Sequence, residues 1–368
     1  MNAFSIIFSD AFCGERIGEL TAKRNLASTP FGGRYRFIDF ILSSLVNARV
    51  PNVGVITRSN YSSLLDHLGS GKDWDLSRKN GGLKILAPFA ESNGRNINTK
   101  IDALMSIKTY IKHSLQEYCI LTDSNIICNI DFNSVLKTHI EKNADITCLY
   151  RTAKVRPGEM SIKTEENGHI SDVLYHTDGT EDEKDTIIKT YIMKKELLLE
   201  LIDKGITFGW EDIDKDFIAR SFNEYKVFAY KITEYCRIIR DINEYYQANQ
   251  DLLNKEIRDE LFTSDNPILT KVKDSVPTMY GENCKISNSL VADGCQIDGI
   301  VENSILFRGS VVKKGCVLKN CIIMQNSVIG ENCVLTNIIA DKNISVSRDK
   351  ILTGYESLPF VISKGTKI

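Results

Sequence analysis

The sequence lacks an excess of either charge. Its 46 lysines and arginines nearly balance its 48 aspartates and glutamates, which leaves a formal net charge of −2. No overall field therefore draws the chain to nucleic acid or to an anionic membrane surface. The chain also lacks any apolar run near the length of about 18 residues that spans a bilayer, and its first residues lack the basic flank of a signal peptide. We expect a soluble, cytoplasmic protein without nucleic-acid or membrane partners.

Paired metal ligands are lacking as well. The ten cysteines include no C-x-x-C pair, and the five histidines show neither H-x-x-x-H nor H-E-x-x-H spacing. Cysteines of a cytosolic protein stay reduced, so these side chains are expected to be small buried hydrophobes. We expect no metal site in this chain.

What the sequence does have is enough apolar material for two or three domains. The chain has 368 residues, and 42% of them are hydrophobic. Up to about residue 250, short apolar runs alternate with helical patterns, which is typical of an α/β sheet. Strands are expected over 3–8, 53–57 and 118–121, helices over 39–48, 101–111 and 241–253, and a charged surface loop over 177–185.

Beyond about Pro277 the pattern repeats every six residues. Six aliphatic residues lie six apart: Ile305, Val311, Val317, Ile323, Ile329 and Leu335. A second column, two residues earlier, is mostly small: Asn303, Gly309, Gly315, Cys321, Ser327 and Cys333. An aliphatic residue pointing inward from each short strand and a small residue at each corner specify a parallel β-helix. Val291 and Ile297 share the spacing in another phase, which predicts a small insertion between Ile297 and Ile305.

These patterns divide the chain into three parts. We expect an α/β domain over residues 1–253, a linker over 254–280 and a β-helix domain over 281–368, with the coils in about 281–350.

Three motifs carry a resemblance to a known family. They are Gly14-x-Arg16-x-x-x-Leu20-Thr21, the block from Pro30 to Phe40 (P-F-G-G-R-Y-R-F-I-D-F) and the block from Asp66 to Leu76 (D-H-L-G-S-G-K-D-W-D-L). Together with the hexapeptide repeat they resemble bacterial glucose-1-phosphate adenylyltransferase over nearly the whole chain. The resemblance implies a Rossmann-like, GT-A-like nucleotidyltransferase domain followed by a left-handed parallel β-helix. It also implies a magnesium-dependent reaction of ATP with glucose 1-phosphate that gives ADP-glucose for glycogen.

The nucleotide loop departs from the family pattern. Aligned without gaps, the family's A-G-G-x-G-x-R-L places Ala11 and Phe12 where two glycines belong, and only Gly14 and Arg16 are left of the loop. Glycines let backbone N–H groups approach phosphate closely, so a phenylalanine there would fill the space that phosphate needs.

The positions that the resemblance assigns to substrate and magnesium also differ. A substrate-facing lysine of the family aligns on Leu26. The two magnesium-binding aspartates align on Asn125 and Ile238, and an aliphatic side chain cannot bind magnesium. A one-residue shift would offer Asp123 in place of Asn125. The family's G-T-A-D-A and S-M-G-x-Y segments have become Thr99–Ala103 and Ile187–Tyr191.

Structural motifs thus persist while site motifs are lost. The chain resembles the GlgD-type, non-catalytic subunit of this family, which implies a regulatory role beside a catalytic subunit. Magnesium is then expected in that partner, and no cofactor in this chain. Arg34 and Arg36 occupy basic positions that resemble an effector contact, which makes them candidate ligands for an anionic sugar phosphate.

Three other functions fit parts of the pattern. One is an active nucleotidyltransferase with an atypical metal site, which needs paired acidic residues elsewhere in the cleft. Another is a hexapeptide acyltransferase, but all five histidines precede residue 177, so the β-helix offers none as a general base. A free-standing sugar-phosphate sensor is the last.

Overall fold

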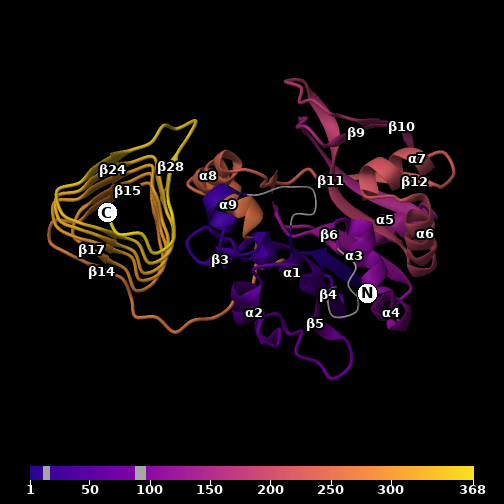
Figure 1. The fold of residues 1–368 in the computed structure, drawn as a ribbon, viewed down its shortest axis with the longest axis horizontal. Coiled ribbons are helices and arrows are strands. Elements are labelled where there is room, and N and C mark those ends of the chain that lie inside the picture. Colours follow the sequence, from indigo (N-terminus) through magenta and orange to yellow (C-terminus); the bar gives the residue numbers. More distant parts are fainter. Residues whose placement is uncertain (11–16, 88–96) are drawn as a thin grey trace.

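The structure is a computed structural model, and it describes residues 1–10, 17–87 and 97–368. Both expected parts are present: an α/β nucleotidyltransferase domain and a left-handed parallel β-helix, which lie side by side (Figure 1). Helices α8 (Ile242–Asp251) and α9 (Lys255–Leu261) lie between the two parts. The segment expected as a linker thus contains helix α9, and the first strand of the β-helix is β14 (Met279–Tyr280).

A mixed nine-stranded sheet forms the centre of the first domain. Strands β5, β4, β1 and β6 are parallel, β11 is antiparallel to β6, and β9, β10, β8 and β12 extend the sheet beyond β11. The strands are β1 (Ala3–Phe8), β4 (Asn52–Ile56), β5 (Gly82–Leu86), β6 (Tyr118–Asp123), β8 (Ile146–Lys154), β9 (Met160–Thr164), β10 (Ile170–Tyr175), β11 (Glu183–Lys194) and β12 (Val227–Lys231). Two small sheets pair β2 (Pro30–Phe31) with β3 (Tyr35–Arg36), and β7 (Ile126–Cys128) with β13 (Cys236–Ile238).

Helices cover both faces of this sheet. On β1, Phe4 and Ile6 pack among residues of α3, α4 and α6, whereas Ala3 and Ile7 pack among residues of α1, α2 and α5. Successive side chains of a strand point to opposite faces, which explains why β1 is buried along its whole length. The helices are α1 (Phe37–Asn47), α2 (Ser62–Leu68), α3 (Lys100–Ser106), α4 (Lys108–His113), α5 (Phe132–Glu141), α6 (Lys195–Phe208) and α7 (Ala219–Ser221), with short 3-10 or π turns at Gly18–Thr21, Leu26–Ser28, Lys72–Trp74 and Ile213–Ile218.

The expected elements of this domain are confirmed with two corrections. The single helix predicted over 101–111 is two helices, α3 and α4, because the backbone leaves helical geometry at Ile107 (φ −102°, ψ 14°). The charged segment 177–185 is a loop up to Glu183, where β11 begins.

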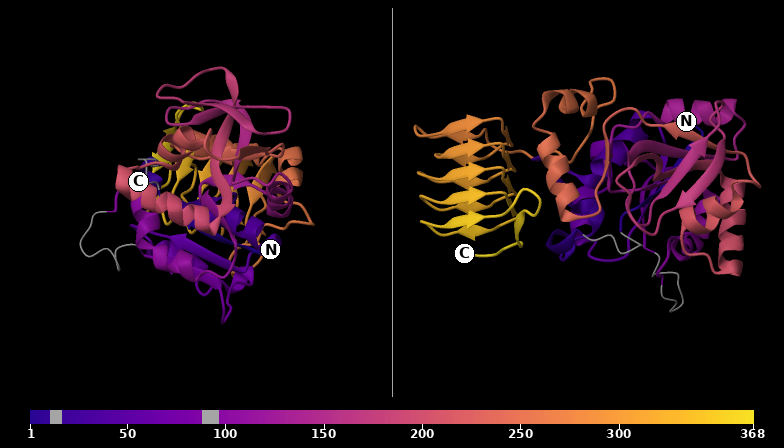
Figure 2. Two further views of the ribbon diagram at one scale, coloured as in Figure 1. Left: turned by 90° about the vertical axis from the view of Figure 1, so that its right-hand side faces the viewer. Right: turned by 90° about the horizontal axis from the view of Figure 1, so that it is seen from above.

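The β-helix consists of three five-stranded parallel sheets whose coils stack along one axis (Figure 2). We call them sheets D, E and F. Sheet D holds β14, β17 (Gln296–Ile297), β20 (Val311–Val312), β23 (Val328–Ile329) and β26 (Ser345–Val346); sheet E holds β15 (Lys285–Ser287), β18 (Ile300–Glu302), β21 (Val317–Lys319), β24 (Val334–Thr336) and β27 (Ile351–Thr353); sheet F holds β16 (Leu290–Val291), β19 (Ile305–Leu306), β22 (Ile322–Ile323), β25 (Ile338–Ala340) and β28 (Phe360–Ile362).

The repeat of this helix is one whole coil, which corrects the strict period of six. Ile305 pairs with Ile322, and Val311 pairs with Val328. Two steps of six and one of five make such a coil, so the column of aliphatic residues changes sides along the chain. Ile323, Ile329 and Leu335 point inward as predicted, but Val311 and Val317 are only partly buried and their neighbours Val312 and Leu318 fill the interior instead.

The corners explain the shorter step. Left-handed backbone occurs at Asn303, Gly309 and Gly315, and then shifts by one residue to Asn320, Asn326 and Asn332. Glycine and asparagine adopt this conformation at little cost, so they mark the corners better than small size does. The predicted insertion after Ile297 is wrong as well: Ile297 pairs directly with Val312, so this coil is shorter than the coils that follow it.

Sheet F packs against the first domain. Its outer column contains Ile305, Ile322 and Ile339, all fully buried in one cluster with Phe31 and Tyr245. A buried ion pair adds to this seam, in which Nη2 of Arg24 lies 2.7 Å from Oδ1 of Asp341. Besides their own cores, the two domains therefore share one apolar cluster at the seam, which we call the shared core.

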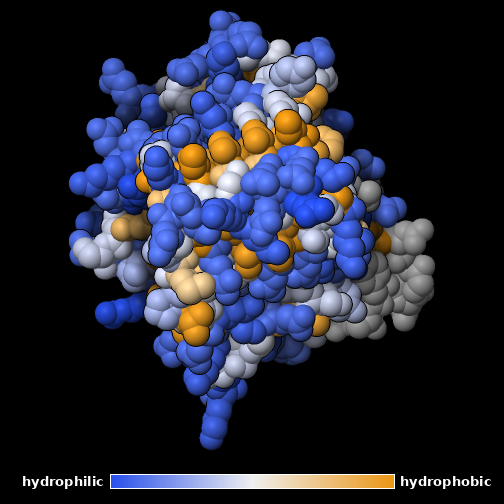
Figure 3. All heavy atoms as spheres, turned by 90° about the vertical axis from the view of Figure 1, so that its left-hand side faces the viewer, coloured by the Kyte–Doolittle hydropathy of each residue, from blue (hydrophilic) through white to orange (hydrophobic). Residues whose placement is uncertain are grey.

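The outer side of the β-helix carries a line of apolar residues (Figure 3). In sheet E, successive strands align Ile300, Val317, Val334 and Ile351 in one outward column. Ile351, at its end, is 75% exposed. In the described ranges, no helix is both long and apolar enough to cross a membrane.

Candidate functional site

In open α/β sheets, ligands bind at the carboxyl ends of the strands, which here are the ends of β1 and β6; we call this edge of the sheet the cleft. Phe8 and Asp123 are neighbours there, at the last positions of the two strands. Asp123 accepts hydrogen bonds from Nζ of Lys100 at 2.6 and 2.7 Å, and both side chains are almost fully buried. The Lys100 ammonium also lies 5.0 Å from the centre of the Phe8 ring. The carboxylate at this edge is thus already neutralised by the chain itself.

More charges gather around this pair. Burial alone would lower the pKa of Lys100, but Asp123 and Asp212 outweigh burial and raise the pKa above its usual value. Asp214 accepts a hydrogen bond from the Tyr191 hydroxyl. Burial, with repulsion from Asp212, raises the pKa of Asp214 to about 7, although Lys189 and Lys100 act in the opposite direction. The cleft therefore holds a compensated set of cations and anions contributed by β6, β11, α3 and the turn before α7.

Lys189 marks an irregularity in β11. The pairing of β11 shifts between Ile187 and Tyr191, and Lys189 adopts a left-handed backbone with φ 54°. A lysine rarely adopts this conformation, because its Cβ crowds the backbone there. The charge of Lys189 acts on Lys100 and Asp214 in the cleft. The bulge lies in the segment where the resemblance expects S-M-G-x-Y.

Three positions expected to have lost their function lie in structural roles. The Asn125 side chain donates a hydrogen bond to the Ile239 carbonyl at 2.9 Å and thereby joins the ends of β7 and β13. Ile238 is 6% exposed and packs in the apolar core, and Leu26 is 5% exposed at the domain seam. Gly14 and Arg16, like Ala11 and Phe12, lie outside the described residues.

These residues do not fit a magnesium ion. Magnesium requires oxygen ligands, usually one or two carboxylates with several waters. Here Asp123 is bound by an ammonium group, Asn125 is engaged with the backbone, and Ile238 offers no oxygen. Within residues 1–10, 17–87 and 97–368, no group of three or more His, Cys, Asp or Glu residues has the arrangement of a metal site.

The block from Pro30 to Phe40 lies between the first domain and the β-helix. Strands β2 and β3 make a hairpin whose turn contains Gly32 and Gly33, at φ 57° and 84°. A Cβ added to Gly33 would lie 3.8 Å from Ile305 of sheet F, so the turn lies against the β-helix. Phe31, Phe37 and Phe40 anchor the hairpin in the shared core. The hairpin therefore has a structural role and presents Arg34 and Arg36 at the domain boundary.

The block from Asp66 to Leu76 packs against the block from Pro30 to Phe40. Nε2 of His67 lies 2.6 Å from Oδ1 of Asp39, whose other oxygen, Oδ2, accepts a hydrogen bond from the backbone N–H of Arg36 at 2.9 Å. The His67 ring makes an edge contact with the fully buried Trp74. Burial lowers the pKa of His67, although Asp39 acts in the opposite direction.

Arg34 and Arg36 line a cavity of about 400 Å³ between the domains. Its cations come from three places: the hairpin, the segment that enters the β-helix, and the edge of sheet F. None of the described residues that line it is acidic. They are Arg34, Tyr35, Arg36, His67, Lys271, Lys273, Ser275, Val276, Gly294, Arg308, Gly309, Gln325, Asn326, Lys342, Asn343 and Lys364.

The cations of this cavity repel one another. Burial, reinforced by Arg36 and Arg24, lowers the pKa of Lys342 to about 7. Burial also lowers the pKa of Arg36 to about 10, and that of Arg308 in the same direction with help from Arg34. The nearby carboxylates are already engaged: Asp341 pairs with Arg24, and Asp293 lies 3.6 Å from Nε of Arg308. The cavity therefore concentrates positive charge that no acidic lining residue offsets.

Most of these cations escaped the sequence analysis. Arg308, Gln325 and Lys342 occupy equivalent places in successive coils, each at the end of a strand of sheet F. The six-residue period hides this column, whereas the period of a whole coil would have revealed it. The pair of Lys100 with Asp123 carried no sequence signal, because it depends on how α3 packs on β6.

Comparison with known proteins agrees with this architecture. Residues 13–174 match the family model "Nucleotidyl transferase", and residues 274–357 match "GlmU-like, C-terminal hexapeptide". The chain is 37% identical over 356 residues to a glycogen biosynthesis protein GlgD of Geobacillus stearothermophilus, covering 96% of this chain and 93% of the relative. The chain belongs to the bacterial glucose-1-phosphate adenylyltransferase family, in its GlgD branch.

Two further relatives, one from each named group of the family, are similar to this chain. A glycogen biosynthesis protein GlgD of Bacillus subtilis is 35% identical over 307 residues, which are 82% of this chain and 78% of the relative. A glucose-1-phosphate adenylyltransferase of Clostridium botulinum is 33% identical over 320 residues, which are 83% and 81% of the two chains. The family thus includes proteins named for glycogen biosynthesis and proteins named for the transferase reaction.

Proposed function

We propose that this chain is a regulatory subunit of cytoplasmic glucose-1-phosphate adenylyltransferase that does not itself make ADP-glucose. The observation that carries the proposal is the pairing of Asp123 with Lys100, and the buried Ile238 stands at the other position that the resemblance assigns to magnesium. Phosphoryl transfer depends on positioned charge around the phosphates, and here the charges compensate one another. Magnesium and catalysis then belong to a homologous catalytic partner.

The competing proposal is an active nucleotidyltransferase with an atypical metal site. Among the described residues, Asp212 and Asp214 are two acidic residues that act on Lys100, the partner of Asp123, and they share the cleft with Lys100 and Lys189. Displacing both ammonium groups would be required before a metal ion could bind there, which is why the regulatory role is favoured.

The regulatory role also needs an input. The cavity lined by Arg34 and Arg36 supports a sugar phosphate or bisphosphate as effector, because its cations come from both domains and carry no acidic counterparts within the lining. An anion there would draw the hairpin, the connecting segment and the β-helix together. The aliphatic column of sheet E offers a partner chain an exposed surface for assembly.

The test combines purification and kinetics. The chain and a catalytic homologue are purified separately, mixed, and measured by light scattering and by pyrophosphate release from ATP and glucose 1-phosphate. The proposal expects no product from this chain alone, a complex of the two chains, and a changed maximal rate or substrate affinity of the mixture. Separate elution at micromolar concentration with unchanged kinetics would refute the regulatory role, and magnesium-dependent product from the pure chain would refute catalytic silence.

A further inference from the structure

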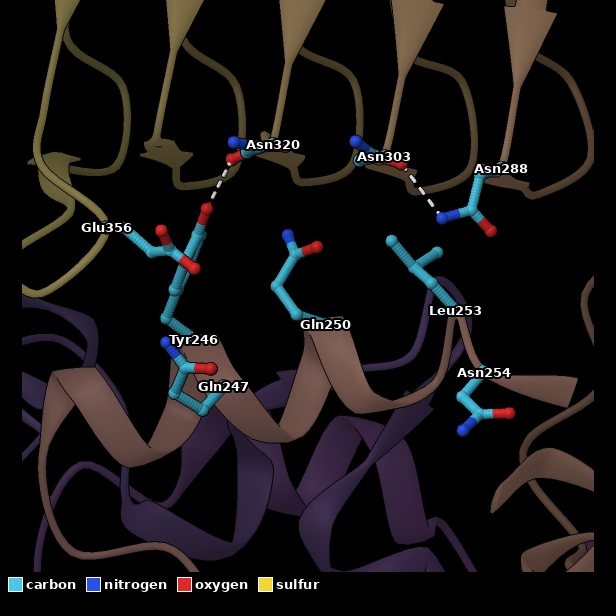
Figure 4. A pocket seen from close by; sticks show the side chains of 9 residues that line it. All are labelled: Tyr246, Gln247, Gln250, Leu253, Asn254, Asn288, Asn303, Asn320 and Glu356. Carbon is cyan, nitrogen blue, oxygen red and sulfur yellow. Dashed lines mark hydrogen bonds between the residues drawn. The ribbon is translucent and has the colours of Figure 1, made fainter. Parts of the chain in front are cut away.

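A second cavity lies at the other edge of sheet F and has a different chemistry. It measures about 350 Å³ and lies between α8 and the corner that joins sheets E and F (Figure 4). None of the residues lining it, all of them described, is a lysine or arginine. Six amide side chains line it: Gln247, Gln250, Asn254, Asn288, Asn303 and Asn320. The remaining lining residues are Tyr246, Leu253 and one acidic residue, Glu356, so this cavity lacks cations, whereas the cavity at the opposite edge of sheet F is rich in them.

The asparagines at this corner form a ladder that is broken at the cavity. Asn288 donates to Asn303 at 2.8 Å, and Asn320 donates to Asn337 at 3.0 Å. Between Asn303 and Asn320 the described side chains make no hydrogen bond, so Nδ2 of Asn303 and Oδ1 of Asn320 lack a protein partner. All four asparagines have a left-handed backbone. The break therefore presents a donor, Nδ2 of Asn303, and an acceptor, Oδ1 of Asn320, to the cavity.

Gln250 faces this break from α8. Figure 4 shows its side chain extending from the helix toward Asn303 and Asn320. Nε2 of Gln250 is buried and has no hydrogen-bond partner. Leaving a buried polar group without a partner costs about 1–3 kcal/mol, so a molecule with hydroxyl groups would gain free energy by supplying one.

The walls beside the amides are suited to a carbohydrate ring. Tyr246 stands at one side, held by its hydroxyl, which donates to the Asn320 carbonyl at 2.8 Å, and Leu253 lies at the other. Amides both donate and accept, as sugar hydroxyls do, and the partly exposed Leu253 offers an apolar contact to the C–H groups of a pyranose, whereas the buried Tyr246 holds the Asn320 corner in place. The volume lies within the usual range for small-molecule sites.

We propose that this amide-lined cavity binds an uncharged sugar, either a free hexose or the end of an oligosaccharide chain. Ligand there would contact α8 of the first domain and two coils of the β-helix at once. It would therefore stabilise the same domain arrangement as an anion on the opposite edge of sheet F, but through hydroxyl recognition.

The experiment measures binding of glucose and of maltotriose to the full-length chain by saturation-transfer NMR. Millimolar affinity is expected, because hydrogen bonds to amides dominate the site. Gln250→Met keeps the side-chain bulk and removes the amide, and Asn303→Gly keeps the left-handed corner and removes the amide. Each should weaken binding about tenfold, the effect of about one hydrogen bond.

Matched controls separate this cavity from the rest of the surface. Gln296→Met, on the exposed side of sheet D, and Asn332→Gly, at the corner of sheets D and E, should leave binding unchanged. Preference for maltotriose would identify a chain end as the ligand, and equal binding would identify a free hexose. Absence of transfer from both sugars at about 50 mM would mean that the cavity holds water only. Binding that both variants leave intact would place the sugar elsewhere, and either result overturns the proposal.

Discussion

The cleft of the first domain and the cavity beside the hairpin differ in whether their charged side chains are compensated by opposite charges. In the cleft, Lys100 and Asp123 are bonded to each other, and Asp212, Asp214 and Lys189 lie around them. In the cavity, Arg34, Arg36, Lys342 and their neighbours face one another without acidic residues in the lining. Folding keeps buried charges only where they are compensated, unless a ligand compensates them later.

This difference in charge compensation indicates which of the two places would be stabilised by a bound ligand. A cleft whose charges are satisfied internally gains little from a phosphate or a metal. A cavity in which burial, together with repulsion from Arg36 and Arg24, lowers the pKa of Lys342 to about 7 would gain from an anion that enters. A compensated cleft beside an uncompensated cavity is the pattern that the proposed regulatory role predicts.

The largest expected effect comes from breaking the compensated pair. Lys100→Met leaves a buried carboxylate without its ammonium partner and should lower the free energy of unfolding by about 3–5 kcal/mol, measured by urea denaturation. The double variant Lys100→Met/Asp123→Leu should recover much of this loss.

Lys108→Met is the control for this experiment. Its partner Asp203 is 60% exposed, so the loss should stay below about 1 kcal/mol. Equal losses at Lys100 and Lys108 would contradict a buried, structural pair in the cleft.

A smaller effect is expected from Asp214. Its pKa of about 7 in the folded state exceeds the unfolded value of about 4, so the folded state binds more protons between these values. The free energy of unfolding should therefore fall as pH rises from 5 to 7, by about 2–3 kcal/mol from this group, and stay level above pH 7.

Asp214→Asn should abolish this fall, because an amide does not ionise. Urea unfolding of both proteins at pH 5, 6, 7 and 8 measures the difference. Parallel pH profiles would show that Asp214 ionises freely in the cleft and that its charge is compensated there.

At the cavity the same kind of substitution should spare stability and change ligand affinity. Arg34 is exposed, so Arg34→Ala should leave unfolding unchanged. Removing one cation should raise the concentration of a sugar bisphosphate needed for half-maximal activation of the mixed enzyme about fivefold, which corresponds to about 1 kcal/mol. Arg348→Ala, at the distant corner of sheets D and E, provides the control. An unchanged activation curve for Arg34→Ala would remove this arginine from the site.

The smallest effect is a pH dependence of anion binding. Lys342 is protonated below about pH 7 and loses its charge above it, so anion affinity should fall about threefold as pH rises from 6 to 8. Sulfate is the suitable probe in calorimetry, since its own charge is constant over this range. The pH dependence should vanish in Lys342→Met; if it persists there, His67, which also lines the cavity, is the group that titrates.

The fold could be predicted from the sequence more completely than the sites. The α/β alternation, the β-helix and strands such as β1 follow from local patterns, because burial on one or both faces imposes a period on the sequence. The phase of the β-helix was harder: the shift from Gly315 to Asn320 as corner residues follows a five-residue step that a strict period of six cannot describe. Arg34 and Arg36 were predicted as effector contacts, and the structure adds the cavity that they line.

The sequence by itself determined which chemistry is impossible at a position: an isoleucine at 238 cannot bind magnesium in any fold. It also determined the coils, since their aliphatic and left-handed residues recur within each strand and corner. Only the tertiary structure decided which charges meet. Arg34 and Lys342 share a cavity although they lie near opposite ends of the chain, and Lys100 reaches Asp123 because α3 packs beside β6. Such contacts depend on packing between segments that are distant in the sequence, which no local pattern records. Packing therefore decides whether a charged side chain has an oppositely charged partner within the chain.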